Sequence, residues 1–294
     1  MQFSRLIKLA VTAFAALGIA SPVPKNETVG PSTGHLLVVG GGTLSDNIWE
    51  RFIDLAGGPS ASIVVVPTAG GEPTYDDDFP AAKSLRDLGA TNVTILHTYD
   101  PEEADTEAFA APLADADGVW FGGGRQWRLV DAYAGTLTEK GFNSVLARDG
   151  VIGGTSAGAS IQGSFLARGD TASNKPIIGD HTVGFSYLKN TAIDQHVLVR
   201  NRHFDMLSLI KKEPELLGLA LDENTALVVK GDNAEVLGAS YAIVYDGTYW
   251  SSEGENVNEL PGEDGLFYFL RDGDRYDLGA RKVLGSASAA TDEL

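Results

Sequence analysis

The stretch 150-GVIGGTSAGASIQGS-164 places a short apolar run, Val151 and Ile152, directly before a serine that glycine and alanine surround. The spacing of Gly154, Ser156 and Gly158 matches Gly-x-Ser-x-Gly, in which a nucleophilic serine occupies a strained turn between a strand and a helix. Small neighbours let such a turn close and let a substrate approach. An ordinary glycine-rich turn also fits this stretch, so the rest of the chain has to distinguish the two interpretations.

Apolar runs rich in valine and isoleucine recur before this stretch, with helix-like segments between them, at residues 36–39, 63–66, 93–96 and 118–121. Continuous apolar strands that alternate with helices are typical of a parallel sheet covered on both faces. The pattern predicts a three-layer α/β/α fold with a mostly parallel central sheet. A strand-rich C-terminal extension is expected to continue the same sheet, from segments 227–229, 242–245, 265–270 and 276–284.

The N-terminus has the features of a secretory signal peptide. Arg5 and Lys8 form a charged start, residues 9–20 are almost wholly apolar, and Gly18 and Ala20 supply the small residues that signal peptidase needs. We therefore expect a signal peptide at 1–20, a linker at 21–33, a single domain at 34–284 and a tail at 285–294.

We expect the protein to be secreted. Two sequons, at Asn26 and Asn92, are glycosylation sites if the host is eukaryotic. Residues 291–294, TDEL, lack the first Lys or His of an ER-retrieval signal, so retention in the ER is only a minor alternative.

Composition excludes several kinds of chemistry and partner. The chain has no cysteine, which removes disulfides, thiolate metal sites and cysteine nucleophiles. Its formal net charge of −18 argues against nucleic acid or an anionic membrane as partner.

Two further motifs have simple explanations. Residues 40–45, GGGTLS, are better explained as a tight turn between strand and helix than as a dinucleotide-binding loop, because the last glycine of that motif is missing. The acidic run 76–78 lacks the spacing of a calcium loop and is typical of a solvated helix start.

A serine nucleophile requires a base, usually a histidine, and this chain has only five: His35, His97, His181, His196 and His203. No histidine occurs in residues 204–294, whereas α/β-hydrolases place theirs late in the chain. An ordinary lipase or esterase is therefore disfavoured.

Several motifs in order resemble the cyanophycinase and dipeptidase E group of serine peptidases, family S51. They are Val38–Val39 with 40–42, 65–69, 121–126, 154–159, Asp194-Gln195-His196, Arg200-Asn201-Arg202 and 221–226. The resemblance covers roughly residues 35 to 245. It implies a class I glutamine amidotransferase-like fold, with serine where that class normally has cysteine.

The resemblance also implies roles for individual residues. Ser156 would be the nucleophile and His196 the general base, with His203 as a rival base. The backbone N–H groups of Gly123 and Ala157 would form the oxyanion hole, since only glycine lets a backbone come so close. Asp170 is the expected third member of the triad, and Asp180 is the second choice.

Five residues match family positions that line the substrate pocket: Gln126, Asp194, Gln195, Arg200 and Arg202. Arginines could pair with a substrate carboxylate and Asp194 with a substrate cation. If the two arginines lay on a helix, at most one would face the pocket. No metal or organic cofactor is implied, and the family commonly forms homodimers.

Where the cyanophycinase pattern continues to a third arginine, this chain has Asp205, and Val197 follows the histidine in place of Phe. The main hypothesis is a secreted serine exopeptidase that hydrolyses aspartyl peptides of the β-aspartyl-Arg, cyanophycin-like kind. The alternatives are a catalytically decayed binding protein on the same fold and a serine esterase.

Overall fold

The computed structural model describes residues 28–248, 250 and 265–286. The expected signal peptide at 1–20, the sequon at Asn26 and the terminal 291–294 lie outside these residues. In the described ranges, no helix combines the length and the apolar character that a bilayer crossing requires.

The five apolar runs of the N-terminal half form five neighbouring parallel strands, as predicted. In spatial order these are β1 (His35–Val39), β5 (Val151–Thr155), β4 (Gly118–Phe121), β2 (Ser62–Val66) and β3 (Asn92–Ile95). Ser156 therefore follows a strand in the interior of the sheet, next to β1 on one side and β4 on the other.

The sheet is less parallel than predicted, because beyond β1 it continues with antiparallel strands. These are β10 (Thr225–Lys230), β11 (Asn233–Gly238), β14 (Asp274–Asp277) and β15 (Lys282–Ser286). Only Gly231 and Asp232 separate β10 from β11, and a connection of two residues permits only antiparallel pairing.

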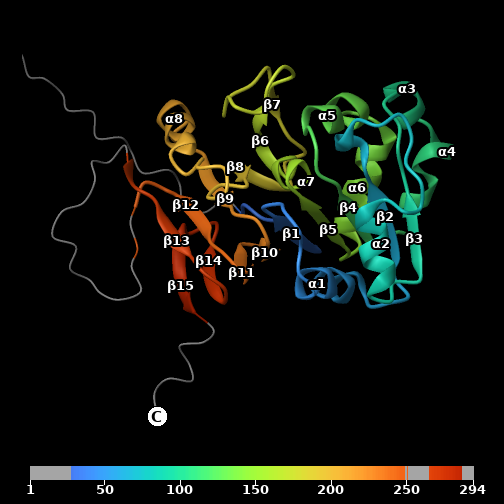
Figure 1. Cartoon of the computed structure of the whole chain (residues 1–294), viewed down its shortest axis with the longest axis horizontal. Helices are drawn as coiled ribbons and strands as arrows, with labels where there is room; N and C mark the ends of the chain where they lie inside the picture. Colours follow the sequence, from blue (N-terminus) through green and yellow to red (C-terminus); the bar gives the residue numbers. More distant parts are fainter. Residues whose placement is uncertain (1–27, 249, 251–264, 287–294) are drawn as a thin grey trace, which may run out of the picture.

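A second sheet takes up the other late strands, which corrects the expectation that they all extend the first. Its order is β13 (Tyr268–Leu270), β12 (Ala242–Tyr245), β9 (Leu217–Leu221), β8 (Leu188–Gln195), β6 (Gly163–Gly169) and β7 (His181–Val183). The fold is thus a mixed α/β structure with two sheets, visible along the chain in Figure 1.

Helices cover both faces of the parallel strands. The α-helices are α1 (Asp46–Ala56), α2 (Pro80–Asp87), α3 (Pro101–Ala104), α4 (Glu107–Ala110), α5 (Trp127–Tyr133), α6 (Leu137–Ala147), α7 (Ala157–Ser160) and α8 (Asp205–Lys212), and two short 3-10 turns are η1 (Thr68–Gly70) and η2 (Ala111–Leu113). Side chains of α1 and α2 pack with Leu37 and Val39, whereas those of α5 and α6 pack with Leu36 and Val38. Alternate residues of β1 thus face opposite cores.

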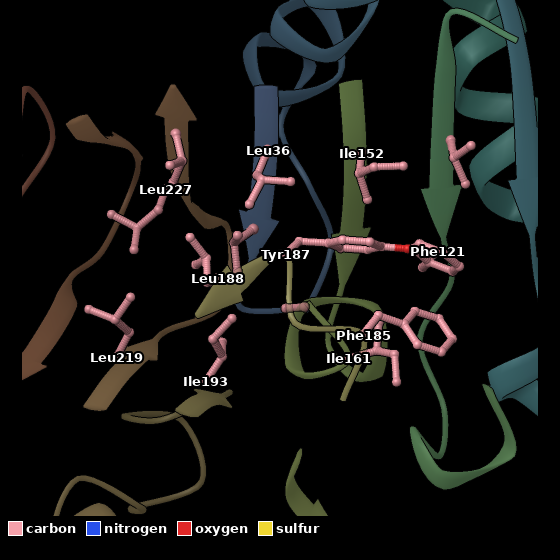
Figure 2. Packing of buried hydrophobic residues seen from close by; sticks show 14 of the residues in the cluster. Leu36, Phe121, Ile152, Ile161, Phe185, Tyr187, Leu188, Ile193, Leu219 and Leu227 are labelled. Atoms are coloured by element: carbon pink, nitrogen blue, oxygen red, sulfur yellow. The ribbon is translucent and has the colours of Figure 1, made fainter. Parts of the chain in front are cut away.

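One apolar core joins the two sheets. Leu36 and Ile152 of the first sheet belong to the same buried cluster as Leu188 and Ile193 of β8 and Leu219 of β9. Figure 2 shows these side chains directed into the space between the strands, beside Phe121, Phe185 and Tyr187. This shared core holds the ends of β5 and β8, and hence Ser156 and His196, in a constant relative position.

Candidate active site

Ser156 occupies a sharp turn between β5 and α7. Its φ is 56° and its ψ −111°, a positive-φ conformation outside the main allowed regions for a residue with a side chain. Its N–H donates to the carbonyl of Val39 at 3.0 Å, which ties the turn to the end of β1. The glycine-rich stretch is therefore a strained elbow rather than an ordinary turn.

His196 lies against this serine from the other sheet. Its Nε2 is 2.8 Å from Ser156 Oγ, although 40 residues separate the two along the chain. His196 follows β8, has a φ of 52°, and donates its N–H to the carbonyl of Gly40 at 2.9 Å. The structure thus brings together the serine and the histidine that the sequence analysis selected.

The carboxylate on the far side of the imidazole belongs to Glu223, and not to Asp170 or Asp180. Nδ1 of His196 donates to Glu223 Oε1 at 2.6 Å. Asp170 instead accepts from the N–H groups of Ala172 and Ser173 within its own loop, and Asp180 accepts from Thr171 and lies beside His181. The prediction of Asp170 was wrong because the acid that reaches the imidazole follows His196 in the chain, after the neighbouring strand β9.

Strand register explains why Glu223 reaches this position. β8 and β9 are parallel neighbours with Gln195 opposite Leu221, so the residues that follow each strand emerge at the same edge of the sheet. His196 and Glu223 are the first and the second residue after these paired ends. The sequence signal that could have identified Glu223 is its place just beyond the apolar strand 217–221.

Burial and charge set the state of the imidazole. Burial of His196, 6% exposed, lowers its pKa below the ordinary value of 6.5; the Glu223 carboxylate opposes this shift, and the positive charge of Arg200 adds to it. The ring is therefore neutral at pH 7. With Nδ1–H directed at Glu223, Nε2 is unprotonated and accepts from the serine hydroxyl.

The turn after β1, predicted from residues 40–45, packs directly on the imidazole. A Cβ placed on Gly41, whose φ is +118°, would lie 2.2 Å from Cε1 and 2.5 Å from Nε2 of His196. No other residue type leaves room for the ring at this point. The sequence analysis identified the turn but not its contact with the site.

The expected oxyanion-hole residues lie beside the serine. β4 and β5 are parallel with Phe121 opposite Gly154, so the glycines that follow β4 run next to Ser156. A Cβ on Gly123 would lie 3.4 Å from the Cβ of Ser156. Ala157 is the first residue of α7, so its N–H has no acceptor within the helix.

Four of the five expected pocket residues, Gln126, Asp194, Gln195 and Arg202, are buried. Gln126 donates to the carbonyl of Ala167 at 2.5 Å, and Gln195 Oε1 accepts from Arg202 Nη1 at 3.0 Å. Arg200 is exposed, and its backbone N–H donates to the His196 carbonyl at 3.0 Å. Arg200 and Arg202 lie on a turn rather than a helix, so the two are not restricted to separate faces.

Asp194 is not free to meet a cation of the substrate. Arg168 binds both of its oxygens, with Nε at 2.7 Å from Oδ1 and Nη2 at 2.7 Å from Oδ2. Arg202 lies 4.0 Å from Oδ1, and burial, followed by the charge of Arg168, lowers the pKa of Arg202 to about 10. The exposed side chain of Arg200 remains as a cationic partner for a ligand, whereas Nη1 of the buried Arg202 donates to the carbonyl and to Oε1 of Gln195.

The other candidate groups lie elsewhere. The His203 ring packs against Phe204 and Phe267 rather than Ser156, which removes it as a base. The acidic run 76–78 is exposed just before α2. Across the residues that the structure covers, no group of three His, Asp or Glu side chains is arranged to hold a metal ion.

The comparisons with known proteins find that this chain is similar to peptidases. The model of peptidase family S51 matches residues 36–237. The cyanophycinase of Geminocystis herdmanii is 30% identical over 255 residues, which cover 82% of this chain and 93% of that protein. The cyanophycinase of Synechococcus elongatus is 32% identical over 280 residues, 88% of this chain and 85% of that protein.

Solved structures agree in fold. A peptidase from an acI-B1 actinobacterium superposes with a TM-score of 0.62 at 22% identity, covering 85% of this chain and 98% of its own. A putative peptidase E from Listeria monocytogenes gives a TM-score of 0.52 at 17% identity, covering 71% of this chain and 100% of its own. At these identities the likeness concerns the fold alone.

Proposed function

Because the chain belongs to peptidase family S51 and is a serine-type peptidase, we propose that Ser156 is its nucleophile, His196 its general base and Glu223 the acid that orients the base. The observation that carries this proposal is the continuous hydrogen-bonded series from Glu223 through His196 to Ser156, at 2.6 and 2.8 Å. These distances are within the range that proton transfer requires.

The mechanism follows from the order of these groups. Ser156 Oγ attacks the peptide carbonyl while His196 Nε2 takes its proton and then delivers it to the leaving amine. Glu223 stabilises the imidazolium that forms between these two steps. The N–H groups of Gly123 and Ala157 donate to the oxyanion, and water then hydrolyses the acyl-enzyme by the same path.

The substrate in this proposal is an aspartyl peptide of the β-aspartyl-Arg kind, cleaved by an exopeptidase. The two relatives compared above are cyanophycinases. Arg200 and Arg202 supply positive charge beside the base, which favours a substrate with a carboxylate near the scissile bond. Asp194, paired with Arg168, adds no free negative charge for a substrate guanidinium.

The test is product analysis by mass spectrometry with β-Asp-Arg, α-Asp-Arg and cyanophycin as substrates. We expect the parent protein to release arginine or β-Asp-Arg. Ser156→Ala and His196→Ala should release neither, whereas the exposed Ser144→Ala on α6 should match the parent. Turnover by Ser156→Ala would contradict the nucleophile, and turnover of none of the three substrates would contradict the substrate class.

The alternatives of a decayed binding protein and a serine esterase have less support. The decayed site was suggested by Val197 and Asp205, which depart from the cyanophycinase pattern, but Glu223, His196 and Ser156 still form a continuous hydrogen-bonded series. Labelling of Ser156 by a fluorophosphonate tests this alternative, because a decayed site would not react. Hydrolysis of short nitrophenyl esters without action on any aspartyl peptide would favour the esterase.

Export is part of the same proposal, supported by the charged start at Arg5 and Lys8 and the apolar segment 9–20. Intact mass of the protein recovered from the medium should show cleavage near Ala20. Glycosylation at Asn92, which is exposed on the edge strand β3, is tested by a mass shift on treatment with a glycosidase. A homodimer stays a prediction that light scattering can decide.

The finer classification of the fold is also proposed. Helices on both faces of β1 support a three-layer arrangement of the parallel strands, with a glutamine amidotransferase-like elbow at Ser156. The single domain over 34–284 remains a prediction. Limited proteolysis that leaves one resistant fragment of this size is the expected outcome.

A further inference from the structure

Arg168 is buried beside the candidate active site, although the proposed mechanism gives it no role. Its side chain is 1% exposed, and its backbone has a left-handed φ of 57° at the end of β6. A guanidinium in such a position must have all of its N–H groups satisfied, because each unpaired donor in the interior is costly.

The side chain of Arg168 uses all five of its N–H groups. Nε and Nη2 bind Asp194, and Nη2 also donates to Asp205 Oδ2 at 2.6 Å. Nη1 donates to the carbonyls of Lys175 at 2.7 Å and Asn174 at 3.3 Å. No donor is left for a substrate, so Arg168 cannot act by binding one.

These bonds join four separate segments to one point. Asp194 lies near the end of β8, Asp205 begins α8, Asn174 and Lys175 lie between β6 and β7, and Arg168 itself belongs to β6. Arg168 therefore joins the loop between β6 and β7 and the start of α8 to the end of β8.

Asp194 connects Arg168 to the backbone just before the base, His196. Its Oδ1 accepts from the N–H of Gln195 at 2.8 Å, and Gln195 immediately precedes His196. His196 has a left-handed φ of 52°, a strained conformation that persists only when its surroundings hold it. The orientation of the Gln195 peptide is thus set by the carboxylate that Arg168 holds.

Asp205 completes the charge balance of this group. Arg168 and Arg202 together carry two positive charges, and Asp194 and Asp205 carry two negative charges. Asp205 occupies the position at which the cyanophycinase pattern has a third arginine. In this chain the negative charge there is the partner of Arg168, 2.6 Å from its guanidinium.

We propose that Arg168 is a positioning residue that holds His196 in its reactive orientation through Asp194, and that Asp205 supports it as a second carboxylate partner. This inference rests on the proposed Ser156–His196 chemistry. It predicts that loss of the bonds from Arg168 to Asp194 and Asp205 slows the reaction at each folded active site without weakening substrate binding.

The experiment measures the rate of fluorophosphonate labelling at Ser156 together with kcat and KM on β-Asp-Arg, each normalised to the titrated sites. Arg168→Lys keeps the charge but loses the two parallel bonds, and we expect labelling and kcat to fall by roughly 10- to 100-fold with KM unchanged, as for a small misplacement of a catalytic group. Asp205→Asn should lower both by roughly 3- to 10-fold, and Asp205→Glu should recover part of the loss.

Arg148→Lys is the matched control, because Arg148 also binds two backbone carbonyls, those of Leu113 and Ala116, away from this site. A purely structural role would reduce the fraction of sites that titrate and leave the rate per site unchanged, which would overturn the inference. If Arg168→Lys does not fold, the labelling rate and kcat per titrated site are measured on Asp205→Asn instead. Values equal to those of the parent protein would overturn the inference.

The outcomes also separate this inference from the function on which it rests. If the parent protein does not label at Ser156, the proposed chemistry fails and the inference with it. If the parent labels normally but cleaves no aspartyl peptide, the substrate class fails while the labelling rates still test Arg168.

Discussion

The carboxylate of Glu223 lies 2.6 Å from Nδ1 of His196, on the side of the imidazole opposite Ser156. The two residues come from the ends of adjacent parallel strands, β8 and β9. This relationship selects one tautomer of the ring and leaves Nε2 free to accept the serine proton.

Replacement of this acid should be costly. We expect Glu223→Gln to lower kcat by roughly 10²- to 10⁴-fold, because a neutral amide neither selects the tautomer nor stabilises the imidazolium. Asp170→Asn is the matched control and should retain kcat within roughly twofold, since its carboxylate accepts from Ala172 and Ser173 of its own loop. The reverse order of effects in steady-state kinetics would restore Asp170 as the acid.

The pH dependence of kcat/KM should report the lowered pKa of His196. The reactive form is the neutral imidazole, so activity should be at its plateau at pH 7 and fall as the pH drops through an inflection below 6.5. Arg200→Gln should move this inflection to higher pH at low salt, because Arg200 disfavours the imidazolium. Lys140→Gln, exposed on α6, is the control and should leave the profile in place.

The turn at Gly41 should tolerate no side chain. Gly41→Ala places a Cβ 2.2 Å from the His196 ring, so we expect kcat to fall by roughly 10²-fold or more. Gly57→Ala is matched in backbone strain, with a φ of +107° against +118°, but nothing lies within 4 Å of its Cβ. Both variants should lose stability, whereas only Gly41→Ala should lose activity per folded molecule; equal activities would contradict the contact.

The apolar core between the sheets should dominate stability. Phe142 is fully buried and contacts the rings of Phe121, Tyr133 and Phe185. Phe142→Ala should lower the free energy of unfolding by about 3–5 kcal/mol in urea titration, through lost burial and the cavity left behind. Phe204→Ala, at a residue 61% exposed, should change it by less than about 1 kcal/mol, and a larger loss there would contradict this assignment of the core.

The parallel strands and the elbow were predictable because their signals are local. The runs that became β1 to β5 are continuous and apolar, and the glycines around Ser156 mark its turn directly. The late segments 227–229, 242–245 and 265–270 also carry local strand signals, yet nothing local says which sheet each one joins. Their division between two sheets was therefore missed.

Ser156, His196 and the family could be chosen from the sequence alone. Five histidines limit the candidates for a base, and the ordered motifs that resemble family S51 select His196 among them. Only the tertiary structure decided that Glu223 is the partner of His196, that Gly41 packs on the His196 ring and that Arg168 binds the carboxylate of Asp194. These contacts join residues that lie far apart in the chain. Strand register and shared burial bring them together, and neither is written in a local pattern of residues.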